Sequence, residues 1–354
     1  MSPIAISEGS AMSIKAPLPR HRLGRTDMFI TPVGLGAWAI GGGDWAVGWG
    51  KQDDRQSVEA IRHAVACGIN WIDTAAIYGL GHSEEIVREA LSNIPKSTRP
   101  YVFTKCGLRW DEADRMAPPQ QVGDPASIRF ELEASLRRLG VERIDLYQVH
   151  WPSKDGTPIE EYWQTLLDLK KEGKVRAVGL SNHNLAQLEA AERLGHVDTL
   201  QPPFSAIRRD FAATELPWCI THDTGVIVYS PMQAGLLSGA FTGERAAKLN
   251  ADDWRSRNAE FSGDKLKANL ELAETMRKIG EKRGVTAGAV AIAWTLAWPG
   301  VTGAIVGARA PEQVDGWLAA ANLILSGAER QQIADTIERT GAGSGPALPY
   351  DAVA

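Results

Sequence analysis

Four polar side chains that follow short apolar runs are the residues of this chain best suited to chemistry. Asp73 follows Ile-Asn-Trp-Ile, and Tyr78 lies five residues further on. Lys105 follows Tyr-Val-Phe-Thr, and His150 follows Ile-Asp-Leu-Tyr-Gln-Val. A tyrosine hydroxyl titrates near ~10, so it needs a neighbouring positive charge to give up its proton at neutral pH. Lys105 can supply that charge and Asp73 can hold the ammonium. His150 can hydrogen-bond a carbonyl oxygen, and the set predicts carbonyl reduction.

The four residues need strands that lie side by side, and the chain supplies a suitable pattern. From Thr31 onward, short apolar runs alternate with longer amphipathic segments, which indicates repeated βα units. The predicted strands are 31–35, 70–73, 101–105, 144–150, 175–181, 198–202, 226–230 and 303–306. The predicted helices include 54–67, 83–91, 126–139, 159–171 and 185–194.

Strands that are too short and too apolar to be half exposed favour a closed parallel barrel, with an open doubly wound sheet as the alternative. The predicted fold is therefore an α/β (β/α)8 TIM barrel with an N-terminal β-hairpin and an extra C-terminal helix. In such barrels the active site lies at the carboxyl ends of the strands, which is where the four polar residues fall.

The predicted barrel forms a single domain, residues 21–340, between a flexible N-terminal tail, 1–20, and a flexible C-terminal tail, 341–354. Residues 21–30, with Gly24 near the turn, read as a hairpin that plugs the barrel bottom. The extra helix is expected around 326–340. The long segment 231–264 interrupts the pattern, and such insertions commonly form lids or binding loops.

The composition limits which binding partners the protein is expected to have. The 43 acidic and 38 basic residues give a net charge of −5 without a block of like charge, so nothing attracts nucleic acid or a membrane surface. Cys67, Cys106 and Cys219 are odd in number and far apart, which argues against a disulfide framework or a zinc cluster. We expect a cytoplasmic protein without a metal, acting on a small-molecule carbonyl or alcohol substrate. Its oligomeric state cannot be inferred from these features.

The motifs around the four polar residues resemble those of one family. Asp73-Thr-Ala-Ala-Ile-Tyr78-Gly, Thr104-Lys105-Cys, Asp145-Leu-Tyr-Gln-Val-His150-Trp-Pro and Gly179-Leu-Ser-Asn-His183 are similar to segments of the aldo-keto reductases, particularly bacterial ones of broad aldehyde or sugar specificity. The similarity runs from about Leu23 to Thr340. It implies a (β/α)8 barrel that interconverts aldehydes or ketones and alcohols. It also implies a catalytic tetrad at Asp73, Tyr78, Lys105 and His150, with the tyrosine as general acid.

A cofactor segment follows the last predicted strand. No Rossmann fingerprint is present, because Gly34-Leu-Gly36 continues at the wrong spacing. In Gly307-Ala308-Arg309-Ala-Pro311-Glu-Gln313, small residues expose backbone N–H groups at a helix start and the arginine offers a guanidinium fork, which is typical of a phosphate site.

The family resemblance assigns this segment to the adenosine 2′-phosphate and hence implies NADP(H). It also implies that Ser181, Asn182 and Gln201 hold the nicotinamide amide, that Tyr229 stacks on the ring, and that 230–239 follows the pyrophosphate. The expected cofactor-binding residues are Gly36, Ser181, Asn182, Gln201, Tyr229, Ser230, Pro231, Gln233, Gly235, Leu236, Ser238, Gly239, Gly307, Ala308, Arg309 and Gln313.

The resemblance is incomplete near the adenine. Many relatives carry Glu-Asn three and four positions after the matching glutamine, where this chain has Gly316 and Trp317. The contacts to adenine are therefore left open. Arg208 and Arg209, after the sixth predicted strand, read as surface charge rather than as a cofactor clamp.

Tryptophans gather after the strand ends, and we expect Trp38, Trp49, Trp110 and Trp151 to line the substrate pocket. Such rings suit either a sugar-like polyol aldehyde or an aromatic carbonyl, and they could also simply pack the barrel rim.

Two other functions are alternatives to carbonyl reduction. A non-catalytic NADP(H)-binding sensor or auxiliary subunit, like the potassium-channel β subunits of this fold, would be expected to lack a tetrad member, and none is missing. A Schiff-base aldolase using Lys105 needs a largely uncharged pocket, contrary to the expected Asp73 partner.

Overall fold

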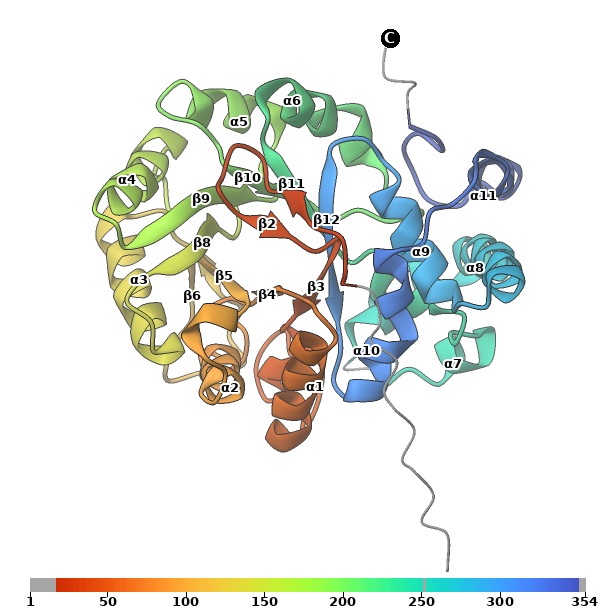
Figure 1. The fold of residues 1–354 in the computed structure, drawn as a ribbon, viewed down its shortest axis with the longest axis horizontal. Helices are drawn as coiled ribbons and strands as arrows, with labels where there is room; N and C mark the ends of the chain where they lie inside the picture. The colour runs from red at the N-terminus through yellow and green to blue at the C-terminus, as the bar shows by residue number, and fades with distance from the viewer. Residues whose placement is uncertain (1–16, 251–252, 350–354) are drawn as a thin grey trace, which may run out of the picture.

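Eight parallel strands close into a barrel in the computed structural model, which describes residues 17–250 and 253–349 (Figure 1). The strands are β3 (Val33–Gly36), β4 (Trp71–Asp73), β5 (Tyr101–Cys106), β8 (Ile144–Val149), β9 (Val175–Ser181), β10 (Thr199–Gln201), β11 (Gly225–Tyr229) and β12 (Val301–Gly307). The last strand pairs with the first, with Ala304 opposite Val33, so the sheet has no open edge. The predicted barrel is confirmed, and the open-sheet alternative is wrong.

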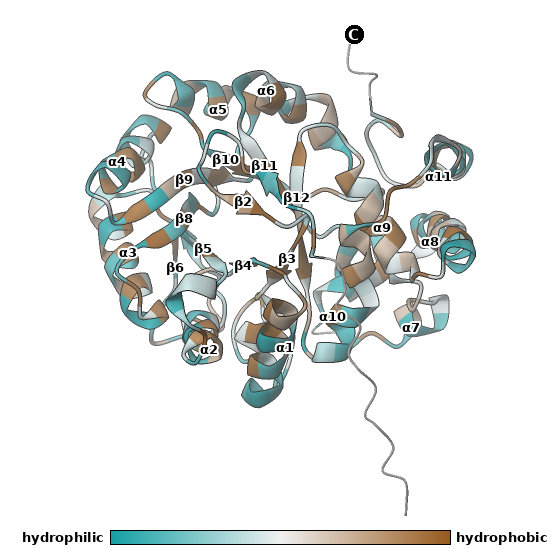
Figure 2. Ribbon diagram, viewed as in Figure 1, coloured by the Kyte–Doolittle hydropathy of each residue, from teal (hydrophilic) through white to brown (hydrophobic). Residues whose placement is uncertain are grey.

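A ring of helices covers the barrel. It consists of α1 (Asp54–Ala66), α2 (His82–Leu91), α3 (Pro125–Leu139), α4 (Ile159–Lys171), α5 (Leu185–Glu192), α6 (Glu215–His222), α9 (Ala287–Leu296) and α10 (Pro311–Leu318). Figure 2 shows teal polar residues on the outer sides of the helices and brown apolar residues among the strands, as expected of amphipathic helices on a buried sheet. Capping fixes the helix starts: Asp53 accepts the backbone N–H of Gln56, and Asp124 accepts that of Ser127.

Three helices lie outside this ring: α7 (Gly243–Ala247), α8 (Gly263–Arg283) and α11 (Gly327–Thr340). The extra C-terminal helix is thus present, and α8, which was not predicted, packs between α9 and α11. Because α8 covers α9, nearly every residue of α9 is buried. No helix in the described parts of the chain is long and apolar enough to cross a membrane.

The connections contain short strands and short 3-10 helices. The strands are β1 (His21–Arg22), β2 (Phe29–Ile30), β6 (Leu108–Arg109) and β7 (Gln120–Gln121). The turns are η1 (Ala39–Gly41), η2 (Lys96–Thr98), η3 (Asp210–Ala213), η4 (Gln233–Ser238), η5 (Trp254–Arg257), η6 (Ala259–Phe261) and η7 (Ala319–Ala321).

The N-terminal hairpin β1–β2, red in Figure 1, lies across one end of the barrel. Leu23, Met28 and Ile30 are fully buried and join a cluster with Trp71 and Phe103 from the barrel interior. The rings of Trp71 and Phe103 lie 5.4 Å apart between centroids. The hairpin therefore plugs the barrel bottom as predicted, which leaves the opposite end for the site.

The start of the predicted C-terminal tail is tied to the domain. Ser344 accepts the backbone N–H of Arg209 at 2.9 Å and donates to the carbonyl of Ile207 at 3.0 Å. The guanidinium of Arg209, only 2 % exposed, donates to the carbonyl of Ala342 at 3.1 Å. The interpretation of Arg209 as surface charge is therefore wrong, because this side chain is buried and donates hydrogen bonds to backbone carbonyls. Most of the predicted N-terminal tail lies outside the described residues.

Gly34 provides a test of packing inside the barrel. A Cβ at this position would lie 2.2 Å from the Trp71 ring, which is fully buried and donates to the carbonyl of Thr31. We expect Gly34→Ala to lower the free energy of unfolding by about 1–3 kcal/mol in urea denaturation, because the ring has no room to move.

Gly316→Ala is the matched control, since a Cβ there meets nothing within 4 Å and α10 gains helix propensity worth up to about 1 kcal/mol. If the Gly34 variant were as stable as the Gly316 variant, the tight contact between β3 and Trp71 would not exist.

Candidate active site

The four predicted catalytic residues lie at one end of adjacent barrel strands. Asp73 ends β4, Lys105 is the penultimate residue of β5, and His150 directly follows β8. These three strands are neighbours in the order β4-β5-β8. Tyr78 follows β4 in a tight turn in which its N–H bonds the carbonyl of Ala75. The structure therefore brings together residues that are up to 77 positions apart in the sequence.

A buried ion pair forms the base of the site. The ammonium of Lys105 lies 2.6 Å from one carboxylate oxygen of Asp73 and donates to the carbonyl of Thr74 at 2.8 Å. The other carboxylate oxygen accepts from the Gln201 amide at 2.8 Å. Both charged side chains are nearly inaccessible, so the predicted ion pair is present. The bond from Gln201 was not predicted, because its partner lies 128 residues away.

Tyr78 and His150 lie closer to the surface than this pair, and both are only half-buried. The Lys105 ammonium is 5.3 Å from the centroid of the Tyr78 ring. The rings of Tyr78 and His150 are 5.7 Å apart and nearly perpendicular, at 77°. A small carbonyl compound at the mouth could therefore meet a phenol and an imidazole above a buried charge.

Burial controls the protonation of these groups. Desolvation, reinforced by the charge of Asp73, raises the pKa of Tyr78 well above its ordinary value. Desolvation and the neighbouring Lys105 charge lower the pKa of His150 well below its ordinary value. Tyr78 is therefore protonated and His150 neutral near pH 7. Burial also raises the pKa of Asp73 and lowers that of Lys105, while their mutual attraction opposes both shifts.

The residues expected to hold the nicotinamide form a hydrogen-bonded group at the ends of β9, β10 and β11. Asn182 donates to the His150 carbonyl at 2.9 Å and accepts from the Tyr229 hydroxyl at 2.8 Å. Ser181 donates to the Gln201 carbonyl at 2.9 Å. This group joins the expected cofactor residues directly to the chain segment that carries His150.

The backbone of the expected pyrophosphate run is unusual. Ser230, Gln233 and Ala234 all have positive φ, between 46° and 57°, which costs free energy for residues with a side chain. Such strain is concentrated at ligand sites, where it points backbone groups at a ligand. The side chains of two expected residues, Leu236 and Ala308, are buried in the hydrophobic core, so only their backbone groups could serve a cofactor.

Arg309 lies between β12 and α10, in the expected phosphate segment, and is already held by the loop after β3. Its guanidinium donates to the Gln52 side chain and to the Lys51 carbonyl. Its backbone N–H donates to the Gln313 side chain at 2.7 Å. Trp317, near the end of α10, is 3 % exposed and packs in the core. The contacts of Arg309 with Gln52 and Lys51 could not be predicted from the sequence, because these partners lie 257 and 258 residues away.

The expected tryptophans divide into two groups. Trp38 packs against Trp49, with ring centroids 5.2 Å apart, and lies 6.4 Å from the Tyr78 ring. Trp38 and Trp110 both pack against an apolar cluster formed by Trp45, Ala75, Ile77 and Leu108. Trp151 lies outside that cluster and is 37 % exposed.

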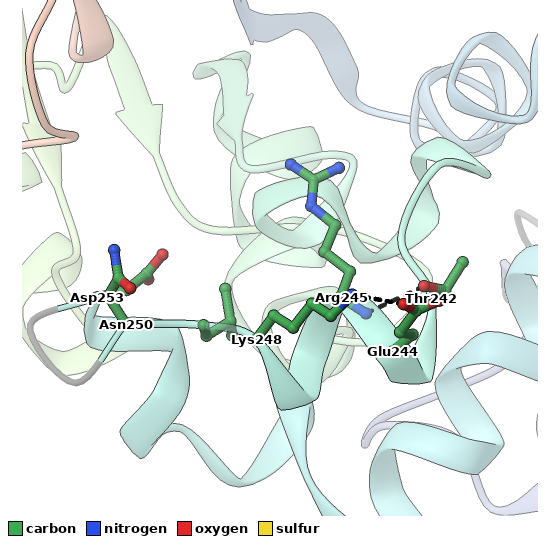
Figure 3. Close-up of a pocket in the computed structure, with 7 residues that line it drawn as sticks. Thr242, Glu244, Arg245, Lys248, Asn250 and Asp253 are labelled. Carbon is green, nitrogen blue, oxygen red and sulfur yellow. Dashed lines mark hydrogen bonds and ion pairs between the residues drawn. The ribbon is translucent and has the colours of Figure 1, made fainter.

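Segment 231–264, the insertion after β11, also contributes to the aromatic wall, as we call the packed rings of Trp38, Trp49 and Trp110. Trp254 packs on Trp49 at 6.2 Å, and the Arg255 guanidinium lies 5.2 Å from the Trp49 ring. The same segment contains a polar surface pocket lined by Thr242, Glu244, Arg245, Lys248, Leu249, Asn250 and Asp253 (Figure 3). None of the tetrad or the expected cofactor residues lines that pocket, so the site rests on the side chains at the strand ends.

A closed parallel barrel with titratable side chains gathered at its strand ends defines a barrel enzyme. Residues 32–338 match the model of the "Aldo/keto reductase family", and the chain belongs to that family. The family expected from the motifs is confirmed.

Known proteins agree with this assignment. The chain is 36 % identical over 337 residues to the "NADH-specific methylglyoxal reductase" of Escherichia coli (strain K12), covering 90 % of this chain and 98 % of that protein. It is 34 % identical to the "Aldo-keto reductase YhdN" of Bacillus subtilis (strain 168), covering 87 % and 90 %. The solved structure of the glycerol dehydrogenase AKR11B4 from Gluconobacter oxydans superposes with a TM-score of 0.83 at 37 % identity, covering 95 % of this chain and 98 % of that one. The protein is therefore an aldo-keto reductase that uses a nicotinamide cofactor.

Removing the charge of Lys105 should expose the cost of burying Asp73. In Lys105→Met the attraction that lowers the Asp73 pKa is lost, so desolvation raises that pKa further. A carboxyl group whose pKa is higher in the folded protein than in the unfolded chain does not affect stability at pH values below the unfolded pKa. As the pH rises from the unfolded pKa toward the folded pKa, the group increasingly destabilises the fold. We expect a loss of about 3–5 kcal/mol near pH 8 that shrinks near pH 5, measured by denaturant unfolding.

The control is the double variant Asp73→Asn/Lys105→Met, in which no buried carboxyl remains and the pH dependence should vanish. A Lys105→Met loss of the same size at both pH values would contradict the presence of an unpaired buried charge.

Proposed function

We propose that this protein is an NADPH-dependent reductase of small aldehydes and ketones, sugar-like aldehydes included, in which Tyr78 donates the proton. The supporting observation is the half-buried phenol of Tyr78, beside His150 and above the inaccessible Lys105–Asp73 pair. When bound, the nicotinamide cofactor supplies the hydride, and the chain's own side chains bind the substrate oxygen and move the proton.

In this proposal Tyr78 keeps its proton until negative charge develops on the substrate oxygen. Its raised pKa holds the hydroxyl protonated at neutral pH, which is the form that can donate. The ammonium of Lys105 then stabilises the phenolate across a poorly solvated space, where a charge acts more strongly than in water. His150, neutral because its pKa is lowered, donates a hydrogen bond to the same substrate oxygen.

Tyr78→Phe should lower the turnover number by about 10²–10⁴, because the variant lacks the general acid. Cofactor affinity, measured by fluorescence titration, should change little, since the hydroxyl acts on the substrate oxygen. His82→Gln, on the exposed start of α2, serves as a control that should keep normal turnover. Near-normal turnover in Tyr78→Phe with a good aldehyde would end the proposed role.

The proposed preference for NADPH over NADH depends on Arg309. Its present partners, the Gln52 side chain and the Lys51 carbonyl, are neutral. A 2′-phosphate carries charge, and charge-assisted hydrogen bonds are about twice as strong as neutral ones, so a phosphate could replace these partners. One relative is named for NADH, so the two cofactors must be compared directly.

Arg309→Ala should weaken NADPH binding by roughly tenfold to a hundredfold and leave NADH nearly unchanged, because only NADPH carries the 2′-phosphate. Arg25→Ala, on the hairpin at the other barrel end, is the matched control that removes an exposed arginine. The measurement is the dissociation constant of each cofactor by isothermal titration. Equal effects on both cofactors would show that the phosphate site is misplaced.

Small polar substrates fit both the site and the names of the relatives. The aromatic wall formed by Trp38, Trp49 and Trp110 offers faces that pack against the C–H groups of a polyol. Methylglyoxal and glycerol, in the names of two related proteins, are small and polar.

The two rival functions are disfavoured. A non-catalytic NADP(H)-binding sensor or auxiliary subunit would not need a complete tetrad around a buried ion pair, and failure of the wild-type protein to oxidise NADPH with any aldehyde would restore that alternative. A Schiff base at Lys105 requires a free amine, but this ammonium is 1 % exposed and bonded to Asp73 and Thr74.

A further inference from the structure

Three side chains of metal-ligating type converge on the outer surface of the barrel, away from the site described above. His63 and Cys67 lie one turn apart at the end of α1, and Asp315 lies on the neighbouring helix α10. Because barrel helices run antiparallel to their strands, the end of α1 lies toward the barrel bottom, opposite the mouth. The cluster therefore has no part in the proposed reduction.

The spacing of the three ligand atoms suits a tetrahedral metal ion. Nε2 of His63 is 3.6 Å from Sγ of Cys67 and 2.8 Å from Oδ1 of Asp315. All three atoms lie within 4.8 Å of one another. Zinc bonds of about 2.0–2.3 Å at tetrahedral angles place ligand atoms about 3.3–3.8 Å apart. Adjustments of roughly an ångström or less would close the site.

The geometry distinguishes a metal site from an activated cysteine. In a Cys-His-Asp triad, the histidine contacts the nucleophile through one ring nitrogen and the carboxylate through the other. Here Cys67 and Asp315 both approach the same nitrogen, Nε2 of His63. Ligand atoms that gather around one point are arranged for a shared ion rather than for a proton relay.

The surroundings also favour a cation. The last turn of α1 presents carbonyl groups with partial negative charge, and a cation near a helix C-terminus is stabilised by them. The side chains of His63 and Asp315 are 33 % and 58 % exposed, so an ion can enter from solvent. The set of one imidazole, one thiolate and one carboxylate matches the ligand preference of a borderline divalent ion such as Zn²⁺.

We propose that His63, Cys67 and Asp315 form a Zn²⁺-type site, with water as the fourth ligand, that clamps α1 to α10. Binding replaces the thiol proton of Cys67, which leaves to solvent, with a metal–sulfur bond. The clamp would connect α1, which begins beside Gln52, with α10, which begins beside Arg309. The hydrogen bond between Gln52 and Arg309 holds the expected phosphate segment. This site departs from the expectation, based on cysteine spacing, that the chain has no metal.

Titration of the whole protein with Co²⁺ alone is the direct test, because thiolate ligation produces a charge-transfer band in the near ultraviolet. The wild type should show this band, and Cys67→Ser should lose it. His63→Gln and Asp315→Asn should each weaken Co²⁺ binding by at least about tenfold. Zn²⁺ should displace Co²⁺ and raise the Tm of the wild type but not of Cys67→Ser.

His82 supplies a matched control without sulfur. Its imidazole lies 2.9 Å from Asp54 and 3.9 Å from Glu85, so it is another exposed histidine between carboxylates. His82→Gln should leave both the Co²⁺ band and its affinity unchanged. Absence of the band in the wild type, or its persistence in Cys67→Ser, would overturn the proposal and reduce His63–Asp315 to a simple interhelix ion pair.

Discussion

The buried ion pair between Lys105 and Asp73 is the constraint on which the rest of the site depends. Two opposite charges can stay in a nearly inaccessible position only when each is neutralised and hydrogen-bonded, and here Gln201 and the Thr74 carbonyl complete that requirement. The pair therefore binds β4, β5 and β10 across the barrel. It also places a positive charge close below the ring of Tyr78, the residue on which the proposed chemistry rests.

Loops that are distant in the sequence meet around this ion pair and form the mouth of the barrel. The loop after β3 contributes Trp49, which packs on Trp254 from segment 231–264, and Gln52, which holds Arg309 after β12. The strained backbone at Ser230 and Gln233 lies at the end of β11, next to these elements in the barrel order. The closed barrel makes this possible, because it brings the ends of its first and last strands together. Cofactor and substrate sites can thus share one rim.

Sequence reasoning succeeded where local patterns carry the information. Apolar runs ending in Asp73, Lys105 and His150 were enough to predict strands, their common end and the ion pair, since a closed parallel barrel leaves little freedom in where a strand end can lie. It failed where the partner is distant. The sequence predicts surface charge at Arg209 because two of its carbonyl partners, Gly345 and Ala342, lie more than 130 residues away. For the same reason, Asp315 could not be connected with His63.

A double-mutant cycle on the turnover number tests most directly whether Tyr78 and the buried charge act as one unit. Tyr78→Phe, Lys105→Met and the combined variant would be compared at saturating cofactor and a slightly acidic pH, where the Lys105→Met protein is expected to be most stable. If two residues act as one unit, replacing either one already removes most of their joint contribution to the turnover number. The account therefore predicts that the double variant is about as slow as the slower single variant. Losses that multiply would show that Lys105 and Tyr78 act independently and would contradict the account.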